Sequence, residues 1–330
     1  MGSRLKIGVF GVGHLGKVHV RLILELQDLY ELVGIYDPMD SHADAVASQF
    51  NIKRFDDPQA LIDACDCISV VTPTLTHFDI ANKAIRSSKH VFVEKPVTET
   101  PEQAKVLLHL AHEAGIQVQV GHVERYNPAF VTARPLIQRP MFFEIHRLAT
   151  YNPRGTDVSV VMDLMIHDLD IVLSLVNSSI RRVSANGIAV VSDTPDMASA
   201  RIEFDNGCVA NLTSSRVSTT NMRKMRVFQP SGYLSVDFLH HQVEQISVMQ
   251  SVPAGMDQVM ALTDSKHFVT TRAHVENSNA ILEELRSFHR SITEGQEVIV
   301  SIDDAYRALD LATRISEKLK STFVAACDNN

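Results

Sequence analysis

The stretch Gly11-Val12-Gly13-His14-Leu15-Gly16 decides the fold, because it follows an apolar run and opens a helical pattern. In this G-x-G-x-x-G spacing, the first glycine allows a tight turn and the second lets the backbone approach a pyrophosphate. The third lets the helix pack closely on the strand, and the helix N-terminus offers free N–H groups to phosphates. The stretch therefore predicts a dinucleotide site formed by Gly11, Gly13, His14 (through its backbone), Leu15 and Gly16.

Asp37 indicates which dinucleotide binds. It ends the second predicted strand, about 20 residues after the glycine-rich turn, where a carboxylate accepts hydrogen bonds from the adenosine ribose hydroxyls. The same carboxylate would repel a 2′-phosphate, and no arginine or lysine follows it at 38–41. These residues favour NAD over NADP. The alternative is a plain turn followed by a surface aspartate.

The first third of the chain alternates apolar strands with helices. Repeated units of this kind predict a parallel sheet covered on both faces, and we expect a Rossmann domain over residues 1–123. Strands are expected at 4–10, 31–36, 52–55, 67–72, 90–94 and 116–121. The first helix carries an apolar stripe of Leu15, Val18, Leu22 and Leu26, and His19 is expected on its surface.

The pattern changes at residues 124–330. Successive strands at 181–249 are separated by turn signals, of which Asn206-Gly207 is typical of a hairpin. Helices are expected at 128–137, 159–176, 280–293 and 303–321. We predict an α/β protein whose second, α+β domain has an open, largely antiparallel sheet for substrate binding and oligomerisation. An alternative is that the last helix packs back on the first domain.

Composition excludes several classes of protein. The 330 residues carry 31 basic and 39 acidic side chains, and nucleic-acid or membrane-surface proteins need a basic face. An apolar strand begins within a few residues of the start, which leaves no room for a signal peptide. The four cysteines show no metal or disulfide spacing. We therefore expect a cytoplasmic protein without a metal site.

Three segments lie where an open α/β sheet binds ligands, just beyond the carboxyl ends of its strands. The first supplies Thr72, Pro73, Thr74 and His77, with His77 expected beside the pyrophosphate or nicotinamide ribose. The second is Glu94-Lys95-Pro96, and the third runs through 121–128. Lys95 could donate a hydrogen bond to a substrate hydroxyl, unless it is an edge lysine in solvent.

Asp163 and His167 are the candidate catalytic pair of the second domain. Their i, i+4 spacing puts both on one face of a mostly apolar helix at 159–176. A carboxylate there can orient an imidazole in its general-base form, although a histidine on an apolar face is often a core residue. Asp168 and Asp170 are interpreted as packing or capping groups.

Together these motifs resemble the Gfo/Idh/MocA oxidoreductase family over nearly the whole chain. The resemblance rests on the glycine motif, Glu94-Lys95-Pro96, Asp163-x-x-x-His167-x-Leu169-Asp170 and Asp303-Asp304-Ala305. It implies a nicotinamide cofactor, a sugar or cyclitol substrate, and dimers or tetramers joined through the sheet. Carried over by position, Lys95, Asp163 and His167 would be the catalytic trio.

Two segments, 121–130 and 154–168, look like the UDP-N-acetylglucosamine 3-dehydrogenase subgroup. That subgroup oxidises the 3-hydroxyl of the sugar so that an aminotransferase can install an amine for lipid A. Tyr126, Arg154 and Arg125 are then candidate substrate contacts, since guanidinium groups bind diphosphates, or the arginines are surface ion-pair partners. The alternatives are an inositol or simple-sugar dehydrogenase and a catalytically silent NAD-binding regulator.

Overall fold

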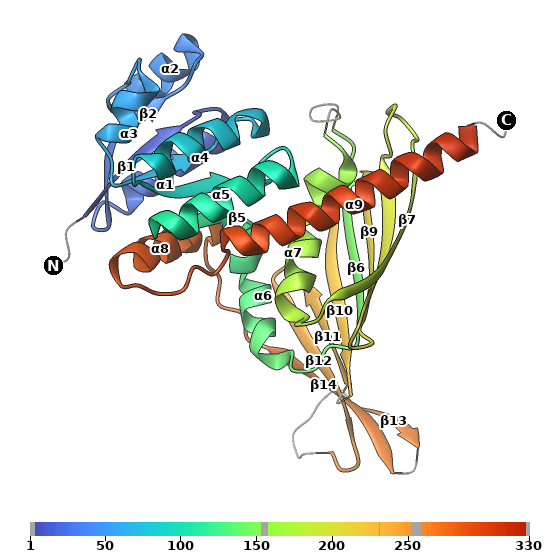
Figure 1. Cartoon of the computed structure of the whole chain (residues 1–330). Coiled ribbons are helices and arrows are strands. Elements are labelled where there is room, and N and C mark those ends of the chain that lie inside the picture. Colours follow the sequence, from blue (N-terminus) through green and yellow to red (C-terminus); the bar gives the residue numbers. More distant parts are fainter. Residues whose placement is uncertain (1–3, 153–157, 231, 253–258, 264, 328–330) are drawn as a thin grey trace. The chain divides into compact units, whose positions relative to one another are not determined.

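The computed structural model describes residues 4–152, 158–230, 232–252, 259–263 and 265–327. The chain divides into two compact units (Figure 1): Met1–Val123 with Asn279–Asp310, and Glu124–Ser278 with Leu311–Asn330. The change at 123/124 coincides with the boundary expected from the sequence. The segment Asn279–Asp310, expected in the second domain, belongs to the first unit instead.

Helix α8 (Ala280–Thr293) explains that reassignment, because its apolar side chains complete the core of the first unit. Leu285 and Phe288 are fully buried in the same cluster as Tyr30 and Phe92. The Tyr30 hydroxyl donates a hydrogen bond of 2.7 Å to the Leu285 carbonyl. Burial of such large side chains stabilises the unit by roughly 1.5–3 kcal/mol each.

The first unit is built on a parallel sheet with the strand order β2-β1-β3-β4-β5 within the described residues. Its strands are β1 (Leu5–Phe10), β2 (Tyr30–Tyr36), β3 (Cys67–Val70), β4 (His90–Glu94) and β5 (Val118–Gly121). Its other helices are α1 (His14–Glu25), α2 (Asp40–Phe50), α3 (Pro58–Asp63), η1 (Thr74–Thr76), α4 (His77–Arg86) and α5 (Pro101–Ala114). The Rossmann prediction is confirmed.

Two local predictions in this unit are wrong. The segment 52–55 forms an isolated bridge between Ile35 and Arg54 rather than a strand, because the chain pairs only briefly with β2 before α3 begins. His19 is fully buried rather than on the surface of α1, while Leu15 is 36% exposed. The buried stripe of α1 includes Gly16, Val20 and Ile23, and His19 lies one turn from Gly16 on that face.

The second unit contains the open sheet, with the strand order β13-β14-β12-β11-β10-β6-β9-β8-β7 in the described residues. All adjacent pairs are antiparallel except β6 with β9. The strands are β6 (Phe142–Thr150), β7 (Ile180–Ile188), β8 (Met197–Phe204), β9 (Val209–Ser218), β10 (Met222–Gln229), β11 (Gly232–Asp237), β12 (Gln242–Met249), β13 (Val259–Thr263) and β14 (Lys266–Ala273). The predicted α+β domain is confirmed.

The helical elements that accompany this sheet include the short turn η2 (Val123–Tyr126) and helix α6 (Pro128–Ala133), followed by η3 (Arg134–Leu136). Helix α6 packs on β11 and β12. The helix expected at 159–176 is divided into a π-helical turn, η4 (Val161–Met165), and α7 (Ile166–Leu175). The final helix, α9 (Ile302–Cys327), contributes to both units.

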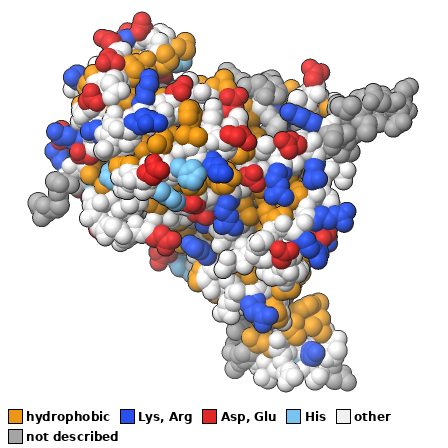
Figure 2. Space-filling view, in the orientation of Figure 1, with side chains coloured by type: hydrophobic (Ala, Val, Ile, Leu, Met, Phe, Trp, Pro, Cys, Tyr) orange, Lys and Arg blue, Asp and Glu red, His pale blue; other side chains and the backbone are white. Residues whose placement is uncertain are grey.

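Lysine and arginine side chains are interspersed with aspartate and glutamate over the face drawn in Figure 2. Among the described residues, no helix combines the length and apolar character needed to cross a bilayer. The same residues contain no cluster of three or more histidine, cysteine or acidic side chains suited to a metal ion.

Candidate cofactor site and catalytic helix

The first unit holds a cavity of about 730 Å³ at the carboxyl ends of its strands. Eight of the residues predicted to bind the cofactor line it: Gly11, Gly13, Leu15, Asp37, Thr72, Pro73, Glu94 and Lys95. Other lining residues, such as Met39, Ile80 and Lys83, come from the segment after β2 and from α4. One cavity is thus lined by the glycine-rich turn, the acidic residue after β2 and the lysine after β4.

Two of the three glycines in the glycine-rich turn have no room for a side chain. Gly11 has φ +84°, and a Cβ there would lie 2.7 Å from the Val71 carbonyl oxygen. A Cβ on Gly16 would lie 2.0 Å from the Gly11 carbonyl oxygen, so α1 packs tightly on the turn. A Cβ on Gly13 would meet nothing within 4 Å. Gly13 therefore leaves open space where a phosphate can approach the backbone, as a dinucleotide requires.

Asp37 is fixed by two backbone N–H groups. Val12 donates to one carboxylate oxygen at 2.8 Å and Met39 donates to the other at 2.9 Å. A carboxylate oxygen has lone pairs for more than one donor, so Asp37 keeps acceptor capacity for ribose hydroxyls. The residues present fit an NAD molecule in this cavity.

The carboxylate of Glu94 lies beside a buried histidine that was not predicted to lie at the site. Its Oε1 lies 3.3 Å from Nε2 of His19, and its Oε2 accepts a hydrogen bond from the Lys95 N–H at 3.2 Å. His19 Nδ1 in turn lies 3.1 Å from the Ser69 hydroxyl. A Cβ on Gly121 would come within 2.6 Å of the same carboxylate. A buried imidazole thus lies next to the carboxylate of Glu94, the residue before Lys95.

His77 does not line the cavity, contrary to the expectation that it flanks the cofactor. Its ring is buried, with Nδ1 2.9 Å from the Pro96 carbonyl and Nε2 2.8 Å from the Thr72 carbonyl. Burial lowers the pKa of His77, against the opposing effect of the two carbonyl groups. The imidazole therefore joins the segment after β3 to the segment after β4, both of which line the cavity.

In the second unit, Asp163 and His167 lie on either side of the junction between η4 and α7. Both are partly exposed, whereas neighbours such as Val161 and Met165 are buried. The sequence predicted one regular α-helix here, whereas the structure has a π turn, with i→i+5 hydrogen bonding, directly before α7. Such turns inside helices are frequent at functional sites.

Arg125 has a different role from the predicted substrate contact. It is 5% exposed, and its guanidinium donates two hydrogen bonds, at 2.7 and 3.2 Å, to the carboxylate of Asp170. The pair is therefore an ion pair, as in the alternative considered for this arginine, but a buried one. Tyr126 is also 5% exposed, and Arg154 lies outside the described residues.

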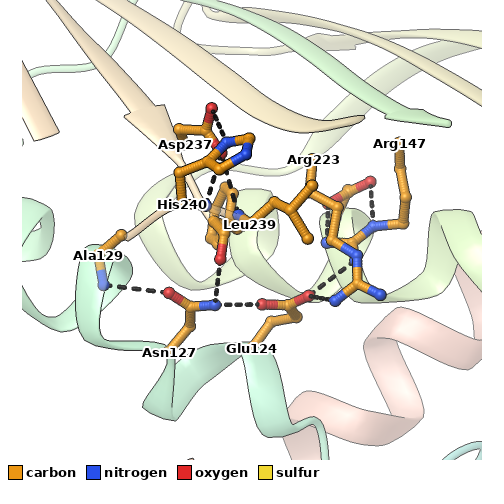
Figure 3. A network of polar contacts seen from close by, with 10 residues as sticks. Glu124, Asn127, Ala129, Arg147, Arg223, Asp237, Leu239 and His240 are labelled. Carbon is orange, nitrogen blue, oxygen red and sulfur yellow. Dashed lines mark hydrogen bonds and ion pairs between the residues drawn. The ribbon is translucent and has the colours of Figure 1, made fainter. Parts of the chain in front are cut away.

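Asp168 is buried as well, and both of its oxygens accept hydrogen bonds from Arg147 of β6, at 3.0 and 2.7 Å. Arg147 also donates to Glu124 at 2.7 Å (Figure 3). The interpretation of Asp168 and Asp170 as packing groups therefore becomes more specific: both are anchors of α7. Neither Arg147 nor Glu124 was among the residues predicted to act at the site.

Family models match both parts of the chain. The model of the GFO/IDH/MocA oxidoreductase family with an NAD-binding Rossmann fold matches residues 5–122, and the GFO/IDH/MocA C-terminal domain matches residues 141–235. The two matches together span well over half of the chain. The chain belongs to the GFO/IDH/MocA oxidoreductase family. Its first unit is the family's NAD-binding domain, which confirms the predicted cofactor.

Among curated members of the GFO/IDH/MocA family, UDP-N-acetylglucosamine 3-dehydrogenase of Acidithiobacillus ferrooxidans is 40% identical over 72% of this chain and 75% of the relative. The solved structure of that enzyme has a TM-score of 0.86 at 32% identity, covering 97% and 99% of the two chains. The scyllo-inositol 2-dehydrogenase (NAD(+)) of Bacillus subtilis is 26% identical over 99% and 98% of the two chains.

The fold also matches scyllo-inositol dehydrogenase from Lactobacillus casei, solved with NAD(H) and scyllo-inositol. The TM-score is 0.78 at 18% identity, with 97% and 98% of the two chains covered. This second GFO/IDH/MocA structure supports the architecture of both units.

Proposed function

We propose that this chain oxidises the 3-hydroxyl of UDP-N-acetylglucosamine to the 3-keto sugar, with NAD as the hydride acceptor. The observation that carries the proposal is the difference in sequence identity between two kinds of relative. A UDP-N-acetylglucosamine 3-dehydrogenase is 40% identical to this chain, whereas the inositol dehydrogenases are 22–27% identical. The cavity with Lys95 at its edge supports the same chemistry.

The proposed roles follow from residue chemistry. NAD, when bound, supplies the acceptor for the hydride that leaves the substrate carbon. Lys95 holds the reacting hydroxyl, and His167 takes its proton, directly or through Lys95, as general-base chemistry requires. Asp163 balances the charge of that pair. Gly11, Gly13, Leu15, Asp37, Thr72, Pro73 and Glu94 hold the cofactor, with further backbone contacts from His14, Gly16 and Thr74.

Several wider assignments belong to the same proposal. Tyr126 and Arg154 remain candidate substrate contacts, and the 3-keto product would pass to an aminotransferase that prepares a lipid A precursor. We place the enzyme in the cytoplasm, as a homodimer or homotetramer joined through the open sheet. Cys65, Cys67 and Cys208 are buried free thiols, as a reducing compartment would favour.

The test is a substrate screen that follows NAD reduction with UDP-N-acetylglucosamine, myo-inositol and free hexoses. We expect turnover with the nucleotide sugar, and trapping of the product with borodeuteride followed by mass spectrometry should place the label at C3. Turnover confined to myo-inositol or a free hexose would replace the proposal with the simple-sugar alternative. NAD binding without turnover on any of these substrates would instead support the regulatory alternative.

A further inference from the structure

Helix α7 is fixed by buried charges on both sides of one turn. Asp168 and Asp170, which follow His167 in the sequence, are 2% and 1% exposed. Each carboxylate accepts two hydrogen bonds from one guanidinium, Arg147 for Asp168 and Arg125 for Asp170. Bidentate pairs of this kind fix orientation as well as distance. The N-terminal half of α7 is therefore anchored to two different elements, β6 and η2.

Glu124 extends the Arg147 anchor to two further elements. Its Oε1 accepts a hydrogen bond from Arg147 at 2.7 Å, and its Oε2 accepts one from Asn127 at 3.0 Å (Figure 3). The same Asn127 amide lies 3.1 Å from the Phe238 carbonyl, and its oxygen accepts from the Ala129 N–H at 3.0 Å. Glu124 therefore connects α7, through Arg147, to the start of α6 and to the end of β11.

The charges of the network balance. Three carboxylates, on Glu124, Asp168 and Asp170, are matched by Arg125, Arg147 and the half-exposed Arg223, whose Nη1 lies 3.6 Å from Glu124. Burial alone would lower the pKa of Arg147, but Asp168 and Glu124 raise it well above its usual range. Arg147 therefore stays charged, and replacing one member leaves another buried charge without its full set of partners.

The position of His167 gives this network a consequence for the reaction. His167 is the second residue of α7 and lies directly after the π-helical turn Val161–Met165. Successive residues of an α-helix are rotated by about 100°. Because its two hydrogen bonds with Arg147 fix the direction of the Asp168 side chain, they also fix the direction of the His167 side chain before it.

We infer that Glu124 and Arg147 are positioning residues, which hold α7 so that the His167 imidazole meets the reacting hydroxyl. This inference rests on the proposed function, in which His167 takes the proton. Neither residue has to touch substrate or cofactor for this role. A misplacement of about 1 Å, caused far from the reacting atoms, can slow catalysis by roughly 10²-fold.

The experiment compares Arg147→Lys and Glu124→Gln with the wild type. Lysine keeps the positive charge of Arg147 but loses the planar guanidinium that donates two parallel hydrogen bonds. Glutamine keeps the volume of Glu124 but loses its negative charge. We expect kcat with UDP-N-acetylglucosamine to fall about 10- to 100-fold in both. The Kd for NAD should be unchanged, and the isotope effect with C3-deuterated substrate should rise because hydride transfer becomes slower than product release.

Two controls separate positioning from stability. Glu144 lies on β6, the strand that also carries Arg147. Glu144→Gln removes the surface ion pair of Glu144 with Arg226 and should leave kcat unchanged. Ile202→Val loosens the core of the same unit and shows how much kcat depends on Tm alone. If the Arg147 and Glu124 variants lose no more kcat than Ile202→Val at a matched fall in Tm, the inference is overturned.

The outcomes also separate this inference from the proposed function. If the wild type is active, His167→Ala is impaired and the network variants keep their kcat, only the positioning role fails. If the wild type oxidises none of the tested substrates, or His167→Ala keeps full activity, the proposed function fails and the positioning role falls with it.

Discussion

The two units hold their candidate residues by different physical means. In the first unit, steric limits at Gly11 and Gly16 and backbone N–H groups around Asp37 shape the cofactor site. In the second unit, buried ion pairs from Arg125 and Arg147 hold α7. Backbone geometry leaves a local pattern in the sequence, whereas an ion pair between distant residues does not. The cofactor site is consequently easier to predict than the contacts that hold the helix carrying His167.

The largest expected effect separates chemistry in the second unit from binding in the first. His167→Ala should lower kcat by about 10²–10⁴-fold, because it removes the proposed general base. The Kd for NAD, measured by calorimetry, should stay close to that of the wild type. His109→Ala, an exposed histidine on α5, is the matched control. Near-normal turnover of the His167 variant would show that the proton goes elsewhere.

Two glycine variants test whether the first unit needs positions without a side chain in the glycine-rich turn. Gly16→Ala places a methyl group 2.0 Å from the Gly11 carbonyl, so we expect destabilisation of about 1–3 kcal/mol and weak NAD binding. Gly13→Ala meets no atom within 4 Å, so its Tm without cofactor should be unchanged. Its NAD affinity should nevertheless fall at least about 10-fold if a methyl group blocks the pyrophosphate. Unchanged affinity in Gly13→Ala would contradict the proposed phosphate approach.

The smallest expected effect concerns a buried carboxylate of the second unit. Asp196 accepts hydrogen bonds from the N–H groups of Val190, Val191 and Ser192 at 2.8, 2.7 and 2.9 Å, and from Arg216 at 3.0 Å. Burial alone would raise its pKa, but these hydrogen bonds hold the pKa well below its usual range.

A lowered folded-state pKa means that this stabilisation is complete above the unfolded value of about 3.9 and is lost as the pH falls below it. The difference in Tm between wild type and Asp196→Asn should therefore be largest at pH 5–7 and shrink toward pH 2. Thermal melts over that range measure it. A constant difference would mean that the ionisation of Asp196 contributes nothing.

The fold was largely predictable because each element is encoded by its own residues. Apolar strands and the glycine-rich turn gave the parallel sheet, and Asn206-Gly207 gave a hairpin between β8 and β9. The isolated bridge at Arg54 was mistaken for a strand, since length and pairing partners are not visible in a short apolar segment. The placement of α8 in the first unit depends on Leu285 and Phe288 meeting a core that is distant in sequence.

The candidate site was predictable only in part. Residues that line the cavity were found because they follow strands or glycines, whereas His19 was missed although it lies on the buried stripe of α1. That stripe is a signal the sequence does contain. The pairing of Arg125 with Asp170 carries no such signal, because an arginine for a diphosphate and an arginine for a buried carboxylate look the same in one sequence.

The discontinuous first unit has a consequence for synthesis of the chain. Residues 1–123 leave the ribosome first, but the core around Tyr30 and Phe92 lacks Leu285 and Phe288 until almost the whole chain has been made. The cofactor domain, although first in the sequence, is therefore not complete until residue 310 has been made. A product truncated before α8 would lack Leu285 and Phe288 and would leave the apolar side chains that they cover exposed.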